Sequence, residues 1–374
     1  MNIGFEAKRV FHNKTGLGNY SRDLVSILSH YFPENNYFLY NPKDSKKKLF
    51  EANNNNVFEK KPFTAFYKKF YNLWRQKGVV NDLCKDKIEI FHGLSGEIPR
   101  GLRSKKIKSV VTIHDLIFIR FPHLYSFFDR KIHYLKFKKA AQEADLIVAI
   151  SEQTKNDIVE FLNVKPSKIK VVYQGCHAVF KESFSEIECD AVVSKFQLPE
   201  KFILNVGTIE TRKNILLAVK AIKSIDAQLV IVGNETSYAN EVKAYIAENN
   251  LEDKVLFLKG LSVRELAILY RLARVFVYPS LYEGFGIPII EALYSKTPVI
   301  TSAGGVFPEA GGLNTLYIDP TSVDEMQEAI LKLWNDDALC AEITQKGFEF
   351  VQKFNDEPIA HQFMEIYRDL VGKR

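Results

Sequence analysis

The chain has 374 residues, of which 46% are hydrophobic and 26% are charged. This length exceeds one ordinary compact core and suits two domains, and the composition excludes a largely disordered chain. It contains no run of about 18 apolar residues that could span a bilayer, and MNIGFEAKRV at its start is too charged for a signal peptide. We therefore expect a cytoplasmic protein whose four cysteines (Cys84, Cys176, Cys189 and Cys340) are reduced, buried thiols.

The two halves of the chain differ in the sign of their charge. Residues 1–150 hold 27 Lys and Arg against 14 Asp and Glu, a net charge of +13, whereas residues 151–374 hold 24 against 31, a net −7. A basic half could meet an anionic acceptor or the anionic leaflet of a membrane. No nucleic-acid-binding signature accompanies this charge, so nucleic acid is the partner we expect least.

Short apolar strands alternate with helical patterns through the first half of the chain. A strand at Asn2–Ala7 leads into the polar segment TGLGNYSRDL (Thr15–Leu24), whose end begins a helix. Further strands are predicted at 37–41, 88–93, 109–115, 145–151 and 169–175. This alternation predicts a parallel sheet covered on both faces, a Rossmann-like domain over residues 1–185.

The segment PFTAFYKKFYNLWRQK (Pro62–Lys77) places six aromatic residues at helical spacing among several bases. A basic amphipathic helix of this kind can lie on a membrane. More often such a helix turns one face into the core, which is the interpretation we favour.

Two features of the first domain could bear on chemistry. His114 and Asp115 end the strand VTIHDL, where a histidine is either packed in the core or faces a ligand. Gly16 and Gly18 lie in a predicted loop, where a backbone N–H could approach a phosphate. The surrounding letters lack the third small residue of a dinucleotide-binding fingerprint.

A second series of strands follows the charged stretch 181–200, at 201–208, 227–234, 254–260, 273–280 and 297–302. It predicts a second doubly wound domain over residues 186–355. The fold class is therefore α/β, with two Rossmann-like domains facing a cleft that could enclose a substrate.

GTIETRKN (Gly207–Asn214) follows the first strand of this second domain and carries adjacent cations, Arg212 and Lys213. An arginine can fork two phosphate oxygens and a lysine supplies a compact charge, so the pair suits a diphosphate. The alternative is a helix start whose charges merely face water.

The segment YPSLYEGFGIPIIEALYSKTPVI (Tyr278–Ile300) joins a strand to a helix through a glycine turn. Glu283 precedes the turn and Glu291 lies within the helix, where they could bind sugar and ribose hydroxyls. The alternatives are a helix-start acid for Glu283 and a solvated face for Glu291.

The catalytic signatures that the chain lacks narrow the chemistry further. There is no P-loop, no H-E-x-x-H, no G-x-S-x-G and no Asp-x-Asp pair. We therefore expect no metal and no cofactor, with Arg212 and Lys213 stabilising the charge on a departing nucleotide.

Over nearly its whole length the chain resembles the retaining glycosyltransferases of family 4, which have the two-domain GT-B fold. The resemblance rests on TGLGNYSRDL, TIHDL, ADLIVAISEQTKNDI (Ala144–Ile158), GTIETRKN, the segment around YEGFGIPIIEAL and PEAGG (Pro308–Gly312). It implies a nucleotide-sugar donor on the second domain, a glycan acceptor on the first, and a last helix (356–374) that crosses back to the first domain.

The resemblance also assigns roles to individual residues. It implies that Arg212 and Lys213 bind the diphosphate, that Glu291 binds the ribose and that His114 lies near the reactive face of the sugar. Glu283 and the backbone of Gly284, Phe285 and Gly286 would lie beside the transferred sugar, and the Gly16–Gly18 loop against the phosphates. Two departures from the family pattern, Lys296 and Phe307, are expected at the rim of the donor site.

The expected reaction is transfer of a hexose, with retention of configuration, onto a glycan in surface polysaccharide or glycoconjugate synthesis. The resemblance favours GDP-mannose as donor, with a UDP-sugar next. A lipid-linked acceptor would place the protein at the cytoplasmic membrane face, and reversing the charge of Lys46–Lys48 or of Lys105, Lys106 and Lys108 would then weaken liposome binding. The alternatives are a catalytically silent binding subunit and a sugar-nucleotide epimerase.

Overall fold

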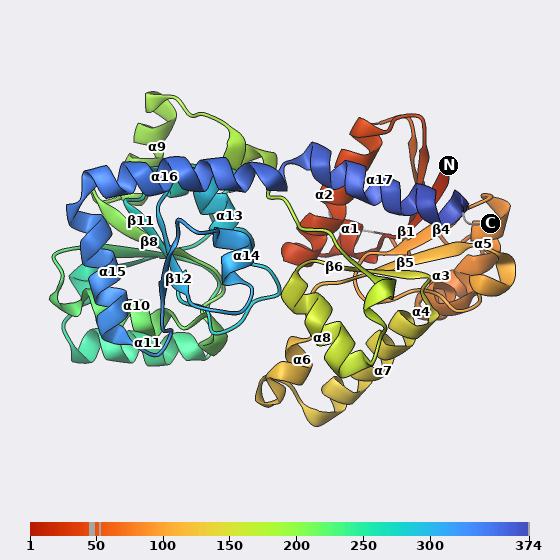
Figure 1. Ribbon diagram of the computed structural model, residues 1–374, viewed down its shortest axis with the longest axis horizontal. Helices are drawn as coiled ribbons and strands as arrows, with labels where there is room; N and C mark the ends of the chain where they lie inside the picture. Colours follow the sequence, from red (N-terminus) through yellow and green to blue (C-terminus); the bar gives the residue numbers. More distant parts are fainter. Residues whose placement is uncertain (45–48, 52–53, 373–374) are drawn as a thin grey trace. The chain divides into compact units, whose positions relative to one another are not determined.

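The computed structural model describes residues 1–44, 49–51 and 54–372, and its chain divides into two compact units. The N-terminal unit comprises Met1–Gln174 and Asn355–Arg374, and the C-terminal unit comprises Gly175–Phe354 (Figure 1). The chain passes between them ahead of the charged stretch 181–200, from which we placed the boundary at residue 185.

The N-terminal unit is built on a parallel sheet whose seven strands, in the described residues, run in the order β3-β2-β1-β4-β5-β6-β7. These are β1 (Asn2–Glu6), β2 (Asn36–Tyr40), β3 (Val57–Lys60), β4 (Ile90–Gly93), β5 (Lys108–Ile113), β6 (Leu146–Ala149) and β7 (Ile169–Val171). The sequence did not predict β3, because this short strand lies at the sheet edge and only its first residue is buried.

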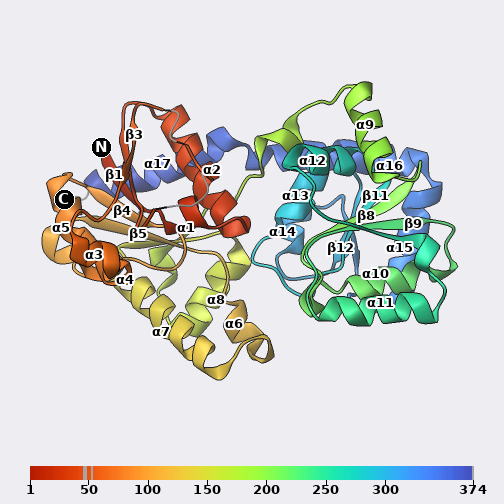
Figure 2. The ribbon, with the colours of Figure 1, turned by 180° about the vertical axis from the view of Figure 1, so that it is seen from behind.

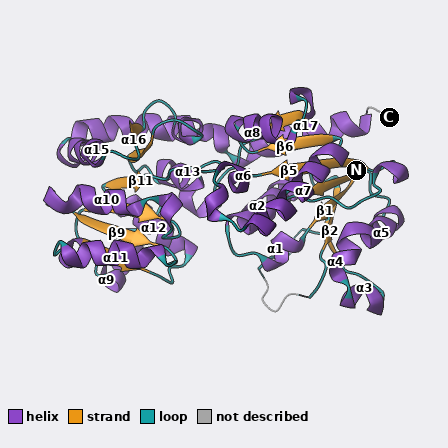
Figure 3. Ribbon diagram, turned by 90° about the horizontal axis from the view of Figure 1, so that it is seen from below, coloured by secondary structure: helices purple, strands orange, loops and turns teal. Residues whose placement is uncertain are grey.

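Helices cover both faces of this sheet, as predicted (Figure 3). They are α1 (Lys8–His12), α2 (Gly16–Tyr31), α3 (Ala65–Lys69), α4 (Tyr71–Leu73), a π-helical turn (Trp74–Gly78), α5 (Val79–Lys85), α6 (Ile117–Arg120), α7 (Phe127–Glu143), α8 (Glu152–Leu162) and α17 (Asp356–Gly372). Phe363 and Tyr367 of α17 share a buried cluster with Ile3 and Phe5 of β1, so the last helix completes the core of this unit.

The C-terminal unit repeats this architecture with six parallel strands in the order β10-β9-β8-β11-β12-β13, counted over the described residues. They are β8 (Phe202–Val206), β9 (Gln228–Val232), β10 (Val255–Leu258), β11 (Val275–Tyr278), β12 (Val299–Ser302) and β13 (Leu316–Ile318). The helices are α9 (Glu186–Phe196), α10 (Ile215–Ala221), α11 (Tyr238–Glu248), α12 (Val263–Leu272), α13 (Ile287–Tyr294), α14 (Phe307–Gly311), α15 (Val323–Asn335) and α16 (Asp337–Val351) (Figure 2).

Each sheet has one point at which the strand order reverses. In the N-terminal unit the reversal lies between β1 and β4, and in the C-terminal unit it lies between β8 and β11. Open parallel sheets bind ligands beyond the carboxyl ends of the strands at such a switch point. The loops after these four strands are therefore the first places to look for a site.

The predicted helix over residues 62–77 is broken. Thr64 caps α3, the backbone leaves helical geometry at Phe70, and a π-helical turn begins at Trp74. Trp74 is buried, with 1% of its surface exposed, so its predicted place in the core is confirmed. The core interpretation is wrong for Phe63, which precedes α3 and is 91% exposed, and for Phe66 and Phe70, which are also exposed. Regular helix stops at Phe70, so the aromatic residues before it do not form one continuous face with Trp74.

The structure bears on two predictions about the whole chain, one on its cysteines and one on a membrane-spanning helix. No disulfide joins the four cysteines, but only Cys176 and Cys340 are buried, and Cys84 is exposed. Among the residues that the structure describes, no helix has both the length and the apolar character needed to cross a bilayer.

Candidate active site

The loop after β8 presents two cations at the switch point of the C-terminal unit. It can lie close to the end of β9 only because residue 233 is a glycine: a Cβ at Gly233 would lie 1.8 Å from the carbonyl oxygen of Gly207. A single 3₁₀ turn, Thr211–Lys213, then positions Arg212 and Lys213. The predicted pair therefore stands at the carboxyl end of a central strand.

The loop after the neighbouring strand β11 brings an acid to the same place. Glu283 is almost fully buried, and Gly286 adopts φ +115° as it starts α13, with Pro288 in the first turn. Residues other than glycine rarely adopt such a backbone conformation. The glycine turn that the sequence indicated is therefore required for α13 to begin where it does.

These two loops form one ionic cluster. Oε1 of Glu283 lies 2.8 Å from Nη1 of Arg212 and 2.6 Å from Nζ of Lys213. Arg212 also donates to the carbonyl of Tyr282 and, at 2.6 Å, to Glu210, while Lys213 donates to the hydroxyl of Tyr278. The structure thus brings three of the predicted site residues into direct contact.

Burial and charge act against each other on these groups. Burial alone would raise the pKa of the Glu283 carboxyl, but Lys213 and Arg212 lower that pKa to about 2. Burial lowers the pKa of Lys213 in spite of Glu283, whereas the acids Glu283 and Glu210 outweigh burial at Arg212 and raise its pKa. The cluster thus holds two largely buried cations against one carboxylate.

Glu291 occupies the helix that the glycine turn begins. The hydroxyl of Tyr270, on α12, donates to Oε2 of Glu291 at 3.0 Å, and the Tyr270 ring is buried against Phe180 and Phe276. Tyr270 thereby holds one carboxylate oxygen of Glu291 in a fixed position. No local sequence pattern indicates this role, because the two residues lie on different helices.

The turn between the two glutamates is anchored by its aromatic residue. Phe285 is buried and meets Phe354 edge to face, with ring centroids 5.5 Å apart. Its side chain is therefore directed into the core, and a contact between this residue and a sugar would use its backbone.

In the N-terminal unit, His114 follows β5 and is buried. Its Nε2 lies 2.9 Å from the carbonyl oxygen of Leu94, and since a carbonyl only accepts, Nε2 carries the proton. Nδ1 then accepts from the Gln174 amide at 3.3 Å, and the Tyr20 ring stands edge-on to the imidazole. Burial lowers the pKa of His114 to about 4, so the ring is neutral at pH 7.

A buried network of hydrogen bonds lies next to this histidine. His92 is completely buried, with Nδ1 2.7 Å from the hydroxyl of Tyr367 and Nε2 2.8 Å from Thr112 Oγ1. Thr112 in turn lies 3.2 Å from the hydroxyl of Tyr20. This network links α17 to the residues around His114, and no local sequence pattern reveals such a long-range relation.

The glycines near the N-terminus are placed differently from the prediction. Gly16 and Gly18 are not in a loop but in the first turn of α2, and the N–H of Gly18 already donates to Asn13 Oδ1 and to the carbonyl of Thr15. Gly18 is needed because a Cβ there would lie 2.0 Å from the carbonyl oxygen of Asn13. A Cβ on Gly16 would meet nothing within 4 Å, so the Gly16 side of this turn is open.

Lys296 was expected at the rim of the donor site, and this prediction is wrong. Lys296 lies at the end of the connection from β11 to β12, just before β12 begins. It is therefore near the amino ends of the strands, whereas the predicted donor site is at their carboxyl ends. There it adopts φ +57° and its ammonium covers the ring of Phe348. Phe307, by contrast, follows the carboxyl end of β12 and is buried in α14.

No group of three or more His, Cys, Asp or Glu side chains in the described residues could hold a metal ion. Reaction without a metal remains a prediction.

Two family models match the chain. "Glycosyltransferase Family 4" matches residues 30–178 and "Glycosyl transferases group 1" matches residues 186–350. The chain belongs to the family-4 glycosyltransferases. The two matches fall on the two units, so the family assignment made from the sequence motifs is confirmed.

Individual relatives agree with this family, and solved structures agree with the fold. O-antigen chain mannosyltransferase B of Escherichia coli is 26% identical over 98% of this chain and 100% of its own length. O-antigen chain mannosyltransferase RfbU of Salmonella typhimurium is 34% identical over 59% of each chain. Sucrose-phosphate synthase from Thermosynechococcus elongatus has the same fold over the full length of both chains, with a TM-score of 0.81 and 22% identity. WaaG, a glycosyltransferase involved in lipopolysaccharide biosynthesis, matches with a TM-score of 0.72 and 16% identity over both chains.

Proposed function

We propose that this glycosyltransferase moves mannose from GDP-mannose onto a glycan acceptor, with retention of configuration and without a metal, in the synthesis of a surface polysaccharide. The observation that carries the proposal is the contact of Arg212 and Lys213 with Glu283 at the β8–β11 switch point. The O-antigen mannosyltransferases among the relatives favour mannose over other sugars.

The cluster suits a diphosphate leaving group. The two cations contact one carboxylate oxygen, and a diphosphate could take its place with oxygens for both. The displaced carboxylate of Glu283 would then be available to hydroxyls of the transferred sugar. Glu291, held by Tyr270, would accept hydrogen bonds from the ribose hydroxyls.

The chemical step proposed is a substitution on one face of the sugar. The bond from the anomeric carbon to the acceptor oxygen forms as the bond to the phosphate oxygen breaks, and the acceptor proton passes to the leaving phosphate. A carboxyl whose pKa is near 2 is a weak base, so Glu283 is poorly suited to accept that proton. His114 is neutral and donates through Nε2 to a carbonyl, which suits a positioning role.

We further propose that the acceptor is linked to a lipid, so that the protein works at an anionic membrane surface. What supports this is the net charge of +13 on residues 1–150. Membrane charge attracts basic segments within about one Debye length, roughly 8–10 Å at physiological salt.

The first test is a thermal-shift panel with GDP, UDP, ADP, CMP and their common sugars. Wild type is compared with Lys213→Ala and Glu291→Ala, and Lys259→Ala serves as a control because this lysine is exposed on the same unit. Stabilisation by GDP and GDP-mannose that is lost in the first two variants only is expected. Selective stabilisation by a UDP-sugar would replace the donor, and the absence of any shift would favour a silent subunit.

The second test follows the product by proton NMR, using GDP-mannose and a mannose-terminated oligosaccharide. An α-mannoside formed from the α-configured donor is the expected product. A β-mannoside would contradict retention, and a new sugar nucleotide formed without acceptor would indicate an epimerase.

A further inference from the structure

Large apolar side chains are exposed mainly in two segments of the N-terminal unit. Four lie between Phe63 and Leu73, on and around α3 and α4, and six lie between Leu124 and Leu135, at the start of α7. Large exposed apolar patches on soluble proteins mark interaction sites. We refer to these two segments together as the aromatic-basic face.

Helix α7 has apolar residues on two opposite sides. Its inner side packs Tyr134, Phe137 and Ala141 into a buried cluster of this unit. Phe128 is 76% exposed, and with Ile132 and Leu135 it forms an i, i+4, i+7 stripe on the outer side, where all three are exposed. Folding of this unit explains the inner side of α7 and leaves the outer side without a structural role.

The two segments are neighbours in space. Glu97 bridges them, with Oε2 3.1 Å from Arg75, in the π-helical turn after α4, and Oε1 3.5 Å from Lys136 of α7. Figure 3 shows α3 and α4 apart from α7, so the link between the two segments rests on this pair of contacts. Glu97 therefore ties the two segments into one region of this unit, in which each segment carries its own exposed apolar side chains.

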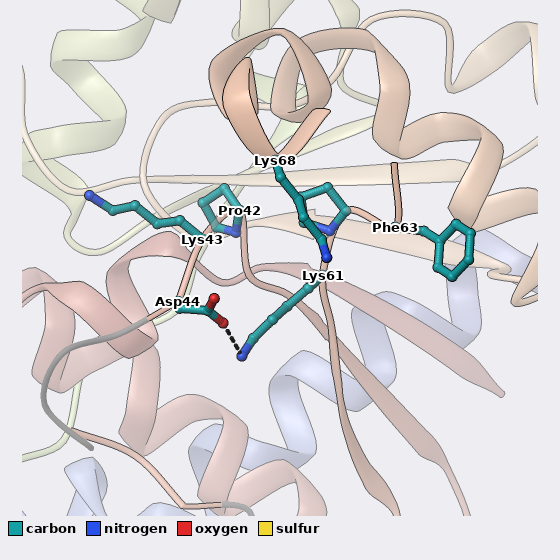
Figure 4. A pocket seen from close by; sticks show the side chains of 7 residues that line it. Pro42, Lys43, Asp44, Lys61, Phe63 and Lys68 are labelled. Carbon is teal, nitrogen blue, oxygen red and sulfur yellow. Dashed lines mark hydrogen bonds and ion pairs between the residues drawn. The ribbon is translucent and has the colours of Figure 1, made fainter. Parts of the chain in front are cut away.

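This region is strongly basic. Residues 61–78 contain five Lys and Arg and no acid, and residues 120–139 contain six Lys and Arg and one acid, Asp129. Lysines also line a hollow of about 400 Å³ at the edge of α3, together with Asp44 and Phe63. Figure 4 shows Lys68 reaching from α3 toward Lys61, Asp44 bonded to Lys61, and the Phe63 ring standing clear of them.

The geometry points to the aromatic-basic face as the surface by which this protein docks on an anionic lipid bilayer. Lysines interleaved with aromatic tips match a headgroup layer, where the rings enter the acyl boundary and the ammonium groups stay with lipid phosphates. Lysine is depleted from protein–protein interfaces, so a lipid surface fits this composition better than a protein partner. The inference builds on the lipid-linked acceptor proposed above and adds the surface that meets the membrane.

The test is co-sedimentation of the full chain with vesicles of phosphatidylcholine alone or mixed with phosphatidylglycerol, at low and high salt. Wild type should bind the anionic vesicles and be released by salt. The double variant Phe66→Ser, Phe128→Ser should bind at least about tenfold more weakly, because both rings lose their apolar burial. Leu313→Ser with Ile187→Ser is the matched control, since both residues are exposed on the C-terminal unit.

A second pair of variants tests charge. Reversing Lys68, Lys69 and Lys131 to glutamate should lower binding by more than about a hundredfold, because each basic side chain near an anionic surface contributes about fivefold. Lys105, Lys106 and Lys108 line a different hollow, which contains no exposed aromatic residue. The basic sequence around them led us to expect that reversing these three would weaken liposome binding, but the aromatic-basic face predicts that this equal change in net charge leaves most binding intact. The earlier candidates Lys46–Lys48 lie outside the described residues.

The outcomes separate this inference from the proposed function. Vesicle binding lost only in the aromatic-basic variants, with GDP stabilisation and transfer to a soluble acceptor unchanged, supports the inference. Failure of wild type to bind anionic vesicles, or equal loss in the control variants, overturns it even if transfer proceeds. Self-association through Phe66 and Phe128, seen by gel filtration without vesicle binding, also overturns it. Vesicle binding without transfer would refute the proposed function and leave the docking surface standing.

Discussion

Replacing Glu283 by glutamine removes the resident anion of the ionic cluster while keeping the shape of the side chain. The pKa of this carboxyl falls from 4.5 to about 2, a stabilisation of about 3 kcal/mol at roughly 1.4 kcal/mol per pH unit. This contribution is fully present above pH 4.5 and is lost as the pH falls toward 2. At pH 7 we therefore expect Glu283→Gln to lower the free energy of unfolding by about 3 kcal/mol, since Arg212 and Lys213 lose a buried partner.

The same substitution should strengthen the binding of a free nucleoside diphosphate. In wild type the diphosphate must displace the Glu283 carboxylate, whereas in the variant it meets two cations that lack this counter-ion. We expect a gain of about tenfold or more in affinity, together with a loss of transfer, because the sugar would lose its carboxylate partner. Few binding-site substitutions improve ligand affinity, which makes this result diagnostic.

The assay combines urea unfolding with isothermal titration of GDP, or of whichever nucleoside diphosphate stabilises wild type. Glu210→Gln is the matched control: it also contacts Arg212, at 2.6 Å, but its side chain is 34% exposed. We expect it to cost less than about 1 kcal/mol. Weaker nucleotide binding by Glu283→Gln, or equal destabilisation by the two variants, would refute the competition of carboxylate and diphosphate.

Three further predictions follow from the site and its support. Tyr270→Phe removes the hydrogen-bond donor that holds Glu291. Because a hydrogen bond to a charged group contributes about 1.5–3 kcal/mol, titration should show at least about tenfold weaker nucleotide binding. Unchanged affinity would contradict the role of Tyr270. Gly286→Ala forces a side chain onto φ +115° with its Cβ 3.3 Å from Ile289, and should lower the free energy of unfolding by about 1–3 kcal/mol in urea; a loss below about 0.5 kcal/mol would show that the turn adapts. Burial lowers the pKa of His92 to about 3 and that of His114 to about 4 from 6.5, so stability present above pH 6.5 should be lost as the pH falls toward 4, by about 1.4 kcal/mol per pH unit for each histidine. His92→Gln should roughly halve this change of the free energy of unfolding with pH, measured by urea unfolding. An unchanged pH dependence would contradict the prediction.

The features that the sequence predicted well are those in which chemistry and local pattern coincide. Arg212 and Lys213 follow a central strand, and Glu283 precedes a glycine turn that opens a helix. Parallel strands place all their carboxyl ends at one edge, so recognising β8 and β11 was enough to bring these residues together.

The features that the sequence did not predict depend on contacts between distant elements. Tyr270 reaches Glu291 from another helix, and Tyr367 reaches His92 from the far end of the chain. Lys296 was misplaced because its position in the sequence, close after Glu291, suggested closeness in space. The eight-residue helix α13, which contains Glu291, runs from the carboxyl ends of the strands back to their amino ends, which is where residue 296 lies.

The exposed aromatic residues illustrate a limit of periodicity. The spacing of Phe63, Phe66 and Phe70 is that of a helix with a buried face, and the break at Phe70 overrides it. A pattern describes which residues share a side of an element, and only tertiary packing decides whether that side is covered.

The donor site is tested most simply by a calorimetric titration of GDP-mannose into wild type, Lys213→Ala and the exposed-lysine control Lys259→Ala. We predict binding by wild type and the control, and a loss of about a hundredfold in Lys213→Ala, because a buried charge-assisted contact with the diphosphate disappears. Equal affinity in all three proteins would show that the donor diphosphate does not bind at the Arg212–Lys213–Glu283 cluster.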